Sequence, residues 1–182
     1  MSEKVRCFVA LNLDPALKDT LQSIQEQLKK EVSFEGKYTD KQHMHLTLKF
    51  FGSIPKTEVQ KIKSRLKSVK GKQFSAQLGT TGVFSEEFVR IIWTELEGNG
   101  IHSLQKMIDD QVVDFAQPEE RFMSHITIAR VNSLKEKEKL LKTIKSLNYE
   151  KSEVVIKSFS LMKSTLTPKG PIYEVIETYK LT

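Results

Sequence analysis

One short pattern occurs twice in the chain and limits what the chain can fold into. The stretches His45-Leu46-Thr47-Leu48 and His125-Ile126-Thr127-Ile128 both read His-x-Thr-aliphatic. Side chains alternate between the two faces of a strand, so histidine and threonine share one face and the aliphatic residues share the other. The pattern therefore predicts two strands, each with its apolar face on a core and its polar face toward a cleft.

The repeated polar face predicts a site with approximate two-fold symmetry, in which each half contributes one imidazole. Histidine has an ordinary pKa of about 6.5, so two histidines beside one reacting centre can act as general base and general acid near neutral pH. Thr47 and Thr127 can hold the oxygens of that centre, and the guanidinium of Arg130 can neutralise developing negative charge. This set of groups suits phosphoryl transfer at a phosphodiester, and we expect no metal ion or other cofactor.

The remaining pattern predicts an α+β chain. Asp14 with Pro15, Pro55, and a capping box of Ser133 with Glu136 each mark the start of a helix. Apolar residues recur either at helical spacing or in β-prone runs. The expected helices cover 15–30, 55–71, 101–116 and 133–147, and the expected strands cover 5–12, 43–51, 73–83, 88–96, 122–131, 153–163 and 172–181, with a loop over 164–171.

The order of these elements indicates an internal duplication, because a helix, a motif strand and a second helix occur in each half. No linker or low-complexity stretch divides the chain. We therefore expect one two-lobed domain over residues 1–182, with two mainly antiparallel sheets facing a central cleft and helices on the outside.

The composition excludes several classes of protein. Hydrophobic residues make up 38% of the chain, yet no apolar run approaches the roughly 20 residues that a membrane span requires. Cys7 is the only cysteine, so neither an internal disulfide nor zinc-finger spacing is possible. The charged N-terminal residues indicate no signal peptide. We expect a cytoplasmic protein without a membrane partner, and a monomer by default.

The net charge of +6 has two interpretations. It can attract nucleic acid or another polyanion, or it can reflect lysines on the solvated faces of amphipathic helices. The second interpretation fits the lysines in or beside two predicted helices, which are Lys61, Lys63, Lys67, Lys70, Lys72, Lys135, Lys137, Lys139 and Lys142.

Five segments, which span almost the whole chain, carry a resemblance to a known family. They are Arg6-Cys7-Phe8-Val9-Ala10, His45 to Gly52, Gly82-Val83-Phe84 with Val89 to Trp93, Ser124 to Arg130, and Lys163 to Glu174. In these segments the chain resembles the two-histidine phosphoesterase superfamily. Within it, the chain is similar to the LigT-like RNA 2',3'-cyclic phosphodiesterases of bacteria and archaea, which are also known as 2'-5' RNA ligases.

The resemblance implies a bilobal fold and hydrolysis of RNA 2',3'-cyclic phosphate ends to 2'-phosphomonoesters. The natural substrate stays open, because tRNA fragments, splicing intermediates and small molecules like cyclic dinucleotides all carry suitable diesters. It implies that His45 protonates the departing 3'-oxygen and that His125 deprotonates the attacking water. Thr47 and Thr127 would bind phosphoryl oxygens and Arg130 would stabilise charge. Weak 2'-5' ligation is an expected side activity. The residues alone leave open which histidine is acid and which is base.

His43 departs from the family pattern, which usually has Asn there. By strand alternation it would share the cleft face with His45, where it could contact substrate. His43, His45 and His125 could instead supply three nitrogen ligands to a metal ion, which is the metal-dependent alternative. The duplicated threonines would have no role in that alternative.

Outside the motifs, Arg90 is a candidate contact to RNA. Phe84 and Trp93 could stack on a base, although positions in the core are the better expectation for both. Tyr173 is a weaker candidate. A further alternative for the whole protein is an RNA-binding module that holds phosphate termini without turnover, but arginine and lysine would serve that purpose better than paired histidines.

Overall fold

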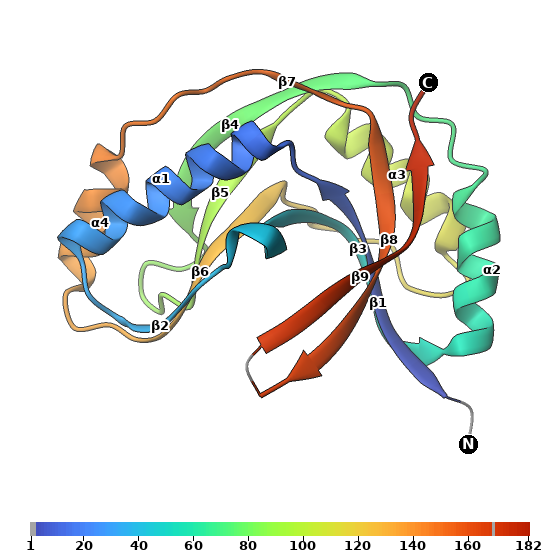
Figure 1. The fold of residues 1–182 in the computed structure, drawn as a ribbon, viewed down its shortest axis with the longest axis horizontal. Coiled ribbons are helices and arrows are strands. Elements are labelled where there is room, and N and C mark those ends of the chain that lie inside the picture. The colour runs from blue at the N-terminus through green and yellow to red at the C-terminus, as the bar shows by residue number, and fades with distance from the viewer. Residues whose placement is uncertain (1–2, 169) are drawn as a thin grey trace.

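A computed structural model of the protein describes residues 3–168 and 170–182 (Figure 1). The helices are α1 (Pro15–Glu31), α2 (Lys56–Leu66), α3 (Ile101–Val112) and α4 (Lys137–Ser146), with a short 3-10 turn η1 (Lys41–His43). The strands are β1 (Lys4–Asn12), β2 (Glu35–Tyr38), β3 (His45–Pro55), β4 (Phe74–Val83), β5 (Ile91–Glu97), β6 (His125–Ser133), β7 (Val154–Ile156), β8 (Ser158–Thr167) and β9 (Gly170–Lys180).

The strands form one curved sheet in the order β7-β4-β5-β6-β3-β1-β8-β9, with β2 paired to β6. All pairs are antiparallel. The two motif strands β3 and β6 meet at the middle of the sheet through a single residue pair, Leu46 with Ile126. The α+β prediction is confirmed, and the two expected sheets are the two halves of this sheet, joined at the motifs.

The helices lie on the outer side of the sheet and are exchanged between its halves (Figure 1). Helix α1 precedes β3 in the chain but packs with α4 against β6 and β4, whereas α3 precedes β6 but packs with α2 against β3. Each motif strand is therefore covered by the helix that leads into the other one, which ties the two halves together.

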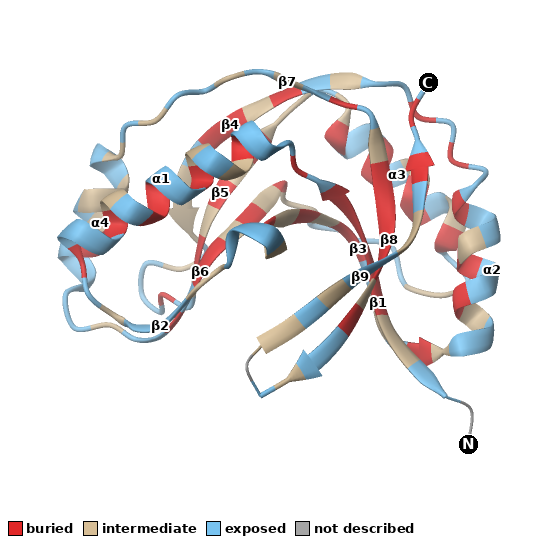
Figure 2. Ribbon diagram, in the orientation of Figure 1, coloured by how far each residue is buried: buried red, intermediate tan, exposed pale blue. Residues whose placement is uncertain are grey.

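The main core lies between the helices and the outer face of the sheet (Figure 2). Leu46 and Leu48 of β3, like Ile126 and Ile128 of β6, are buried in it, while the motif histidines and threonines remain partly exposed. The predicted division of faces is confirmed. A smaller cluster of Phe8, Ala10 and Met162, with Tyr173 against it, lies apart from the main core.

Two of the predicted helix starts hold and one is wrong. The carboxylate of Asp14 accepts a hydrogen bond of 2.9 Å from the backbone N–H of Ala16, and Pro15 begins α1. Pro55 is the residue before α2. The predicted capping box is wrong, because Ser133 is the last residue of β6 and Glu136 makes no side-chain capping bond to α4.

Several expected boundaries are also wrong. Strand β5 begins at Ile91, so residues 88–90 lie outside it, and α2 ends at Leu66, well before residue 71. The expected loop 164–171 is mostly strand, because cross-strand pairing of β8 with β9 continues to Thr167 and Gly170. Lys169, which falls in that stretch, lies outside the described residues. Strand β2 and the turn η1 were not predicted.

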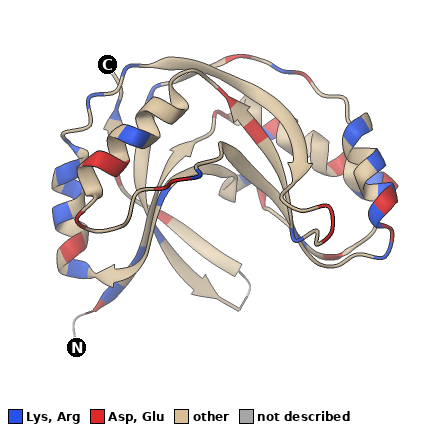
Figure 3. Ribbon diagram, turned by 180° about the vertical axis from the view of Figure 1, so that it is seen from behind, with Lys and Arg blue, Asp and Glu red and all other residues tan. Residues whose placement is uncertain are grey.

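The lysines of the predicted helices occupy the outer surface. The ribbon in Figure 3 marks many Lys and Arg positions on the helices at both ends of the molecule, and Lys61, Lys67, Lys139 and Lys142 are exposed. The interpretation as solvated helix faces is confirmed for these positions. Among the helices in the described part of the chain, none has the length and apolar character needed to traverse a bilayer.

Candidate active site

Both motif strands present their polar faces to one cavity of about 520 Å³. His45 and Thr47 come from β3, and His125, Thr127 and Arg130 come from β6. The remaining walls come from β1, from β2 to η1, from the β8–β9 hairpin, and from one further residue each of β3 and β5. They are formed by Arg6, Phe8, Lys37, Tyr38, Thr39, Asp40, His43, Phe50, Ile91, Ser164, Leu166, Pro171 and Tyr173.

The two histidines are held in the same way. Nδ1 of His45 lies 2.7 Å from the carbonyl oxygen of His43, and Nδ1 of His125 lies 2.9 Å from that of Met123. A carbonyl oxygen can only accept, so we infer that Nδ1 carries the hydrogen in both rings. Nε2 is then the nitrogen that each imidazole has left for a proton transfer.

The surroundings of His45 are aromatic and largely closed. The rings of Phe8 and Tyr173 lie with their centroids 4.9 and 5.1 Å from its own. Burial, helped by the nearby charges of Lys18, His43 and His125, lowers the pKa of His45 to about 4, and its hydrogen bond to the His43 carbonyl opposes this shift. His45 is therefore neutral at pH 7 in the free protein, and an adjacent anion would favour its protonated form.

The surroundings of His125 are more open. Its ring contacts Phe84 edge-on, with the centroids 4.9 Å apart, and Phe84 is itself 51% exposed. The expectation that Phe84 belongs to the core is wrong, because the segment after β4 carries it over the rim of the site. Trp93 is partly buried and lies against Phe84 and Gly82, so its ring is near the site rather than in it.

Arg130 reaches the cavity because β6 is irregular. Strict alternation would place Arg130 with Ile126 and Ile128 on the core face. The pairing of β6 with β5 shifts by one residue between Thr127 and Ala129, as in a β-bulge, and this turns Arg130 to the cleft. Gly36 of β2 packs against the same point, where an added Cβ would lie 2.2 Å from the carbonyl oxygen of Arg130.

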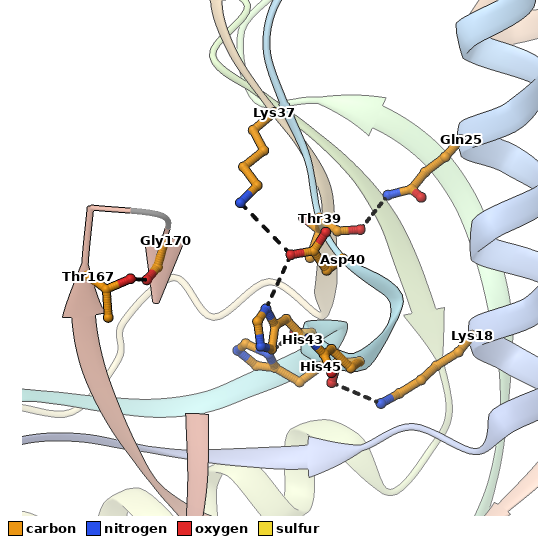
Figure 4. Close-up of polar contacts among 10 residues, drawn as sticks. Lys18, Gln25, Lys37, Thr39, Asp40, His43, His45, Thr167 and Gly170 are labelled. Atoms are coloured by element: carbon orange, nitrogen blue, oxygen red, sulfur yellow. Dashed lines mark hydrogen bonds and ion pairs between the residues drawn. The ribbon is translucent and has the colours of Figure 1, made fainter. Parts of the chain in front are cut away.

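His43 lines the cavity, but not as part of the motif strand (Figure 4). It ends the turn η1, with its Nδ1 3.7 Å from the carboxylate of Asp40, and Asp40 lies 3.9 Å from the ammonium of Lys37. Its ring contacts Tyr173 edge-on. Within residues 3–168 and 170–182, no three His, Cys, Asp or Glu side chains are grouped so as to hold a metal ion, including the proposed three histidines.

Arg90 does not line the cavity. Its guanidinium donates a hydrogen bond of 2.6 Å to the backbone carbonyl of Asn132 at the end of β6. Sequence reasoning missed Arg6, Phe50 and Tyr38 as residues of the cavity. Alternation along β1 places Arg6 on the same face as Phe8. Nothing local to the sequence, however, shows which face of β1 meets the cleft.

Comparison with known proteins identifies the family. The family model for LigT-like phosphoesterases matches residues 11–93 and 95–173, so each matched segment contains one motif strand. The chain belongs to the LigT-like phosphoesterase family. The resemblance found in the sequence is thereby confirmed.

Several archaeal and bacterial proteins are similar to the chain over almost its whole length. RNA 2',3'-cyclic phosphodiesterase of Methanothermobacter thermautotrophicus is 32% identical over 98% of this chain and 100% of that protein. The protein of the same name from Methanocaldococcus jannaschii is 31% identical over 96% of this chain and 100% of its own.

Solved structures share the fold. TT0787 of Thermus thermophilus superimposes with a TM-score of 0.81 at 24% identity, covering 97% of each chain. E. coli LigT in its apo form superimposes with a TM-score of 0.77 at 18% identity, covering 100% of this chain and 99% of its own.

Proposed function

We propose that this LigT-like protein is a metal-independent phosphodiesterase that opens 2',3'-cyclic phosphate ends of RNA, tRNA fragments among them, to 2'-phosphomonoesters. One observation carries the proposal: two imidazoles, one from each half and each held at Nδ1 by a backbone carbonyl, face one cavity with Thr47, Thr127 and Arg130. The names of the relatives, RNA 2',3'-cyclic phosphodiesterases, agree with it.

In the proposed mechanism, His125 accepts a proton at Nε2 from water as the water oxygen bonds to phosphorus. The bond from phosphorus to the 3'-oxygen breaks, and His45 gives its Nε2 proton to that oxygen. The products are a 3'-hydroxyl and a 2'-phosphomonoester. Thr47, Thr127 and Arg130 bind the non-bridging oxygens, whose charge increases in the transition state.

This assignment requires His45 to gain a proton when substrate binds, because burial keeps it neutral at pH 7 in the free protein. The cyclic phosphate is an anion, and an anion close to an imidazole favours the imidazolium form. A 5'-hydroxyl that replaced the water would give a 2'-5' linkage by the same proton transfers, so weak ligation is part of the proposal.

The test is an assay of the purified protein in excess EDTA, with a short RNA that ends in a 2',3'-cyclic phosphate. We expect a 2'-phosphate product. A 3'-phosphate product would show that the ring opens in the opposite direction, with the 2'-oxygen as the leaving group. Product that appears only after zinc or manganese is added would favour the metal-dependent alternative with His43. Tight binding of the RNA without any product would favour the non-catalytic binder.

A further inference from the structure

The two motif strands share an irregularity that points to Arg6. The pairing of β3 with β1 shifts by one residue between Thr47 and Lys49, at the same place after the motif as the shift in β6. This shift turns Phe50 to the cleft, as the other turns Arg130. Phe50 is therefore the counterpart of Arg130 in the first half of the molecule.

A guanidinium nevertheless occupies that side of the cavity. Arg6 reaches over from β1, and its guanidinium carbon lies 4.6 Å above the centre of the Phe50 ring. The side chain of Arg6 makes no hydrogen bond or ion pair with another residue in the described ranges. Stacking on an aromatic ring fixes the plane of the guanidinium and leaves its N–H donors available to an anion.

The charge of the terminal cyclic phosphate does not account for this second arginine. A cyclic diester carries about one negative charge, and one protonated histidine together with Arg130 already exceeds it. The next phosphodiester along an RNA chain carries another negative charge. The same cavity is lined by two apolar, exposed side chains that suit a nucleoside, namely Phe50 at 49% and Leu166 at 68% exposure.

We propose that Arg6, stacked on Phe50, binds the phosphodiester that lies 5' to the terminal nucleotide, so that the cavity recognises an RNA chain rather than a single nucleotide. This inference rests on the proposed function, which places the terminal cyclic phosphate of the RNA in the same cavity. Arg6 binds phosphate oxygens, which position the chain without reading its sequence, and Phe50 with Leu166 contacts the sugar and base.

The test measures binding, so it does not depend on turnover. Three probes are titrated: a dinucleotide that ends in a 2'-phosphate, the same dinucleotide with a neutral methylphosphonate linkage, and a mononucleoside 2'-phosphate. We expect the wild-type protein to bind the charged dinucleotide about tenfold more tightly than the neutral one. In Arg6→Gln that difference disappears, while affinity for the mononucleotide stays within about twofold.

Arg65→Gln is the matched control, because Arg65 lies on the outer face of α2 and pairs with Asp114 at 3.0 Å. It is expected to bind all three probes as the wild type does. Equal loss of mononucleotide binding in Arg6→Gln would place Arg6 at the terminal phosphate and overturn the inference. Equal binding of the two dinucleotides by the wild-type protein would also overturn the inference, and this result does not depend on the folding of a variant. Failure of the proposed function shows separately, as absent turnover of the cyclic phosphate.

Discussion

In each half, a buried side chain of one helix links the segment before one motif strand to the other motif strand, but the groups that make the link differ. Gln25 and Gln105 are both buried, and each precedes the histidine of the next motif by 20 residues. The side-chain amide of Gln25 on α1 donates to the carbonyls of Thr39, just before η1 and β3, and of Ile128 on β6, at 2.9 and 2.8 Å. A neutral side chain thus joins the approach to one motif with the other motif strand.

The second half makes the corresponding connection with a buried ion pair. Asp109 on α3 lies 2.6 Å from the ammonium of Lys49 on β3, and both side chains are almost fully buried. Asp109 also accepts hydrogen bonds from the backbone of Glu119 and from Gln105, and Lys49 donates to the carbonyl of Gln117. The approach to β6 therefore depends on charges held in the core.

The two imidazoles also differ in their surroundings. His45 is enclosed by Phe8 and Tyr173, whereas His125 contacts Phe84 at the open rim. The two motifs thus share their backbone geometry but lie in different surroundings. In the proposed mechanism, this difference allows the two histidines to act separately as acid and base.

The largest effect is expected from removing either imidazole. His45→Ala and His125→Ala should each lower the rate on a 2',3'-cyclic phosphate by about 10²–10⁴-fold. A substrate with sulfur in place of the 3'-oxygen separates the roles, because a thiolate leaves without a proton. We expect His45→Ala to recover most of its rate on that substrate and His125→Ala to recover none. Recovery in His125→Ala alone would exchange the acid and the base.

The anchors are expected to differ in their contribution to stability. Lys49→Met leaves the buried charge of Asp109 unpaired and should lower the free energy of unfolding by about 3–5 kcal/mol. Gln25→Leu removes the donor to the Thr39 carbonyl, while the Ile128 carbonyl keeps the backbone N–H of Thr39, so it should lower the free energy of unfolding by only about 1–3 kcal/mol. Urea denaturation measures both. The double variant Lys49→Met with Asp109→Leu should regain part of the loss, and equal losses in the two single variants would contradict the distinction.

The parts of this comparison that the sequence could predict are the local ones. Alternation along His45 to Leu48 was enough to assign the two faces of a strand, and Asp14 with Pro15 was enough to begin a helix. Both depend on neighbouring residues only. The same reasoning failed for Ser133, because pairing with Glu35 of β2 extends β6 to this residue, which would otherwise suit a helix cap.

The parts that could not be predicted depend on contacts between distant segments. Nothing in α1 shows that it covers β6 rather than the strand that follows it, since its apolar stripe would fit either. The bulges that turn Phe50 and Arg130 to the cleft arise from pairing with β1 and β5. Tyr173 reaches His45 only because β9 forms a hairpin with β8 beside β1.

A smaller effect is expected in the pH dependence of stability. Histidine in an unfolded chain has a pKa of about 6.5, while burial holds the pKa of His45 at about 4 in the folded protein. Between these values only the unfolded chain binds the proton. The contribution to stability is therefore complete above about pH 6.5 and is lost as the pH falls to about 4, by about 3 kcal/mol in total.

Denaturation of the wild type and of His45→Gln at a series of pH values measures that contribution. The glutamine cannot titrate, so the stability of the wild type relative to the variant should decline between about pH 6.5 and about pH 4 and stay level outside that range. A constant difference across the range would show that His45 titrates normally in the folded protein.

The smallest expected effect concerns the aromatic rings around each imidazole. Tyr173 covers His45, so Tyr173→Leu should admit water and raise the pKa of His45 above its value of about 4. Phe84→Leu removes a ring of similar size from His125 and should leave the pKa of His45 unchanged. Imidazole resonances followed by NMR across the pH range report this pKa directly. If both variants shifted it alike, the low pKa would come from the charges that the cavity shares rather than from the enclosure of His45, and the contrast between the two halves would lie in their anchors alone.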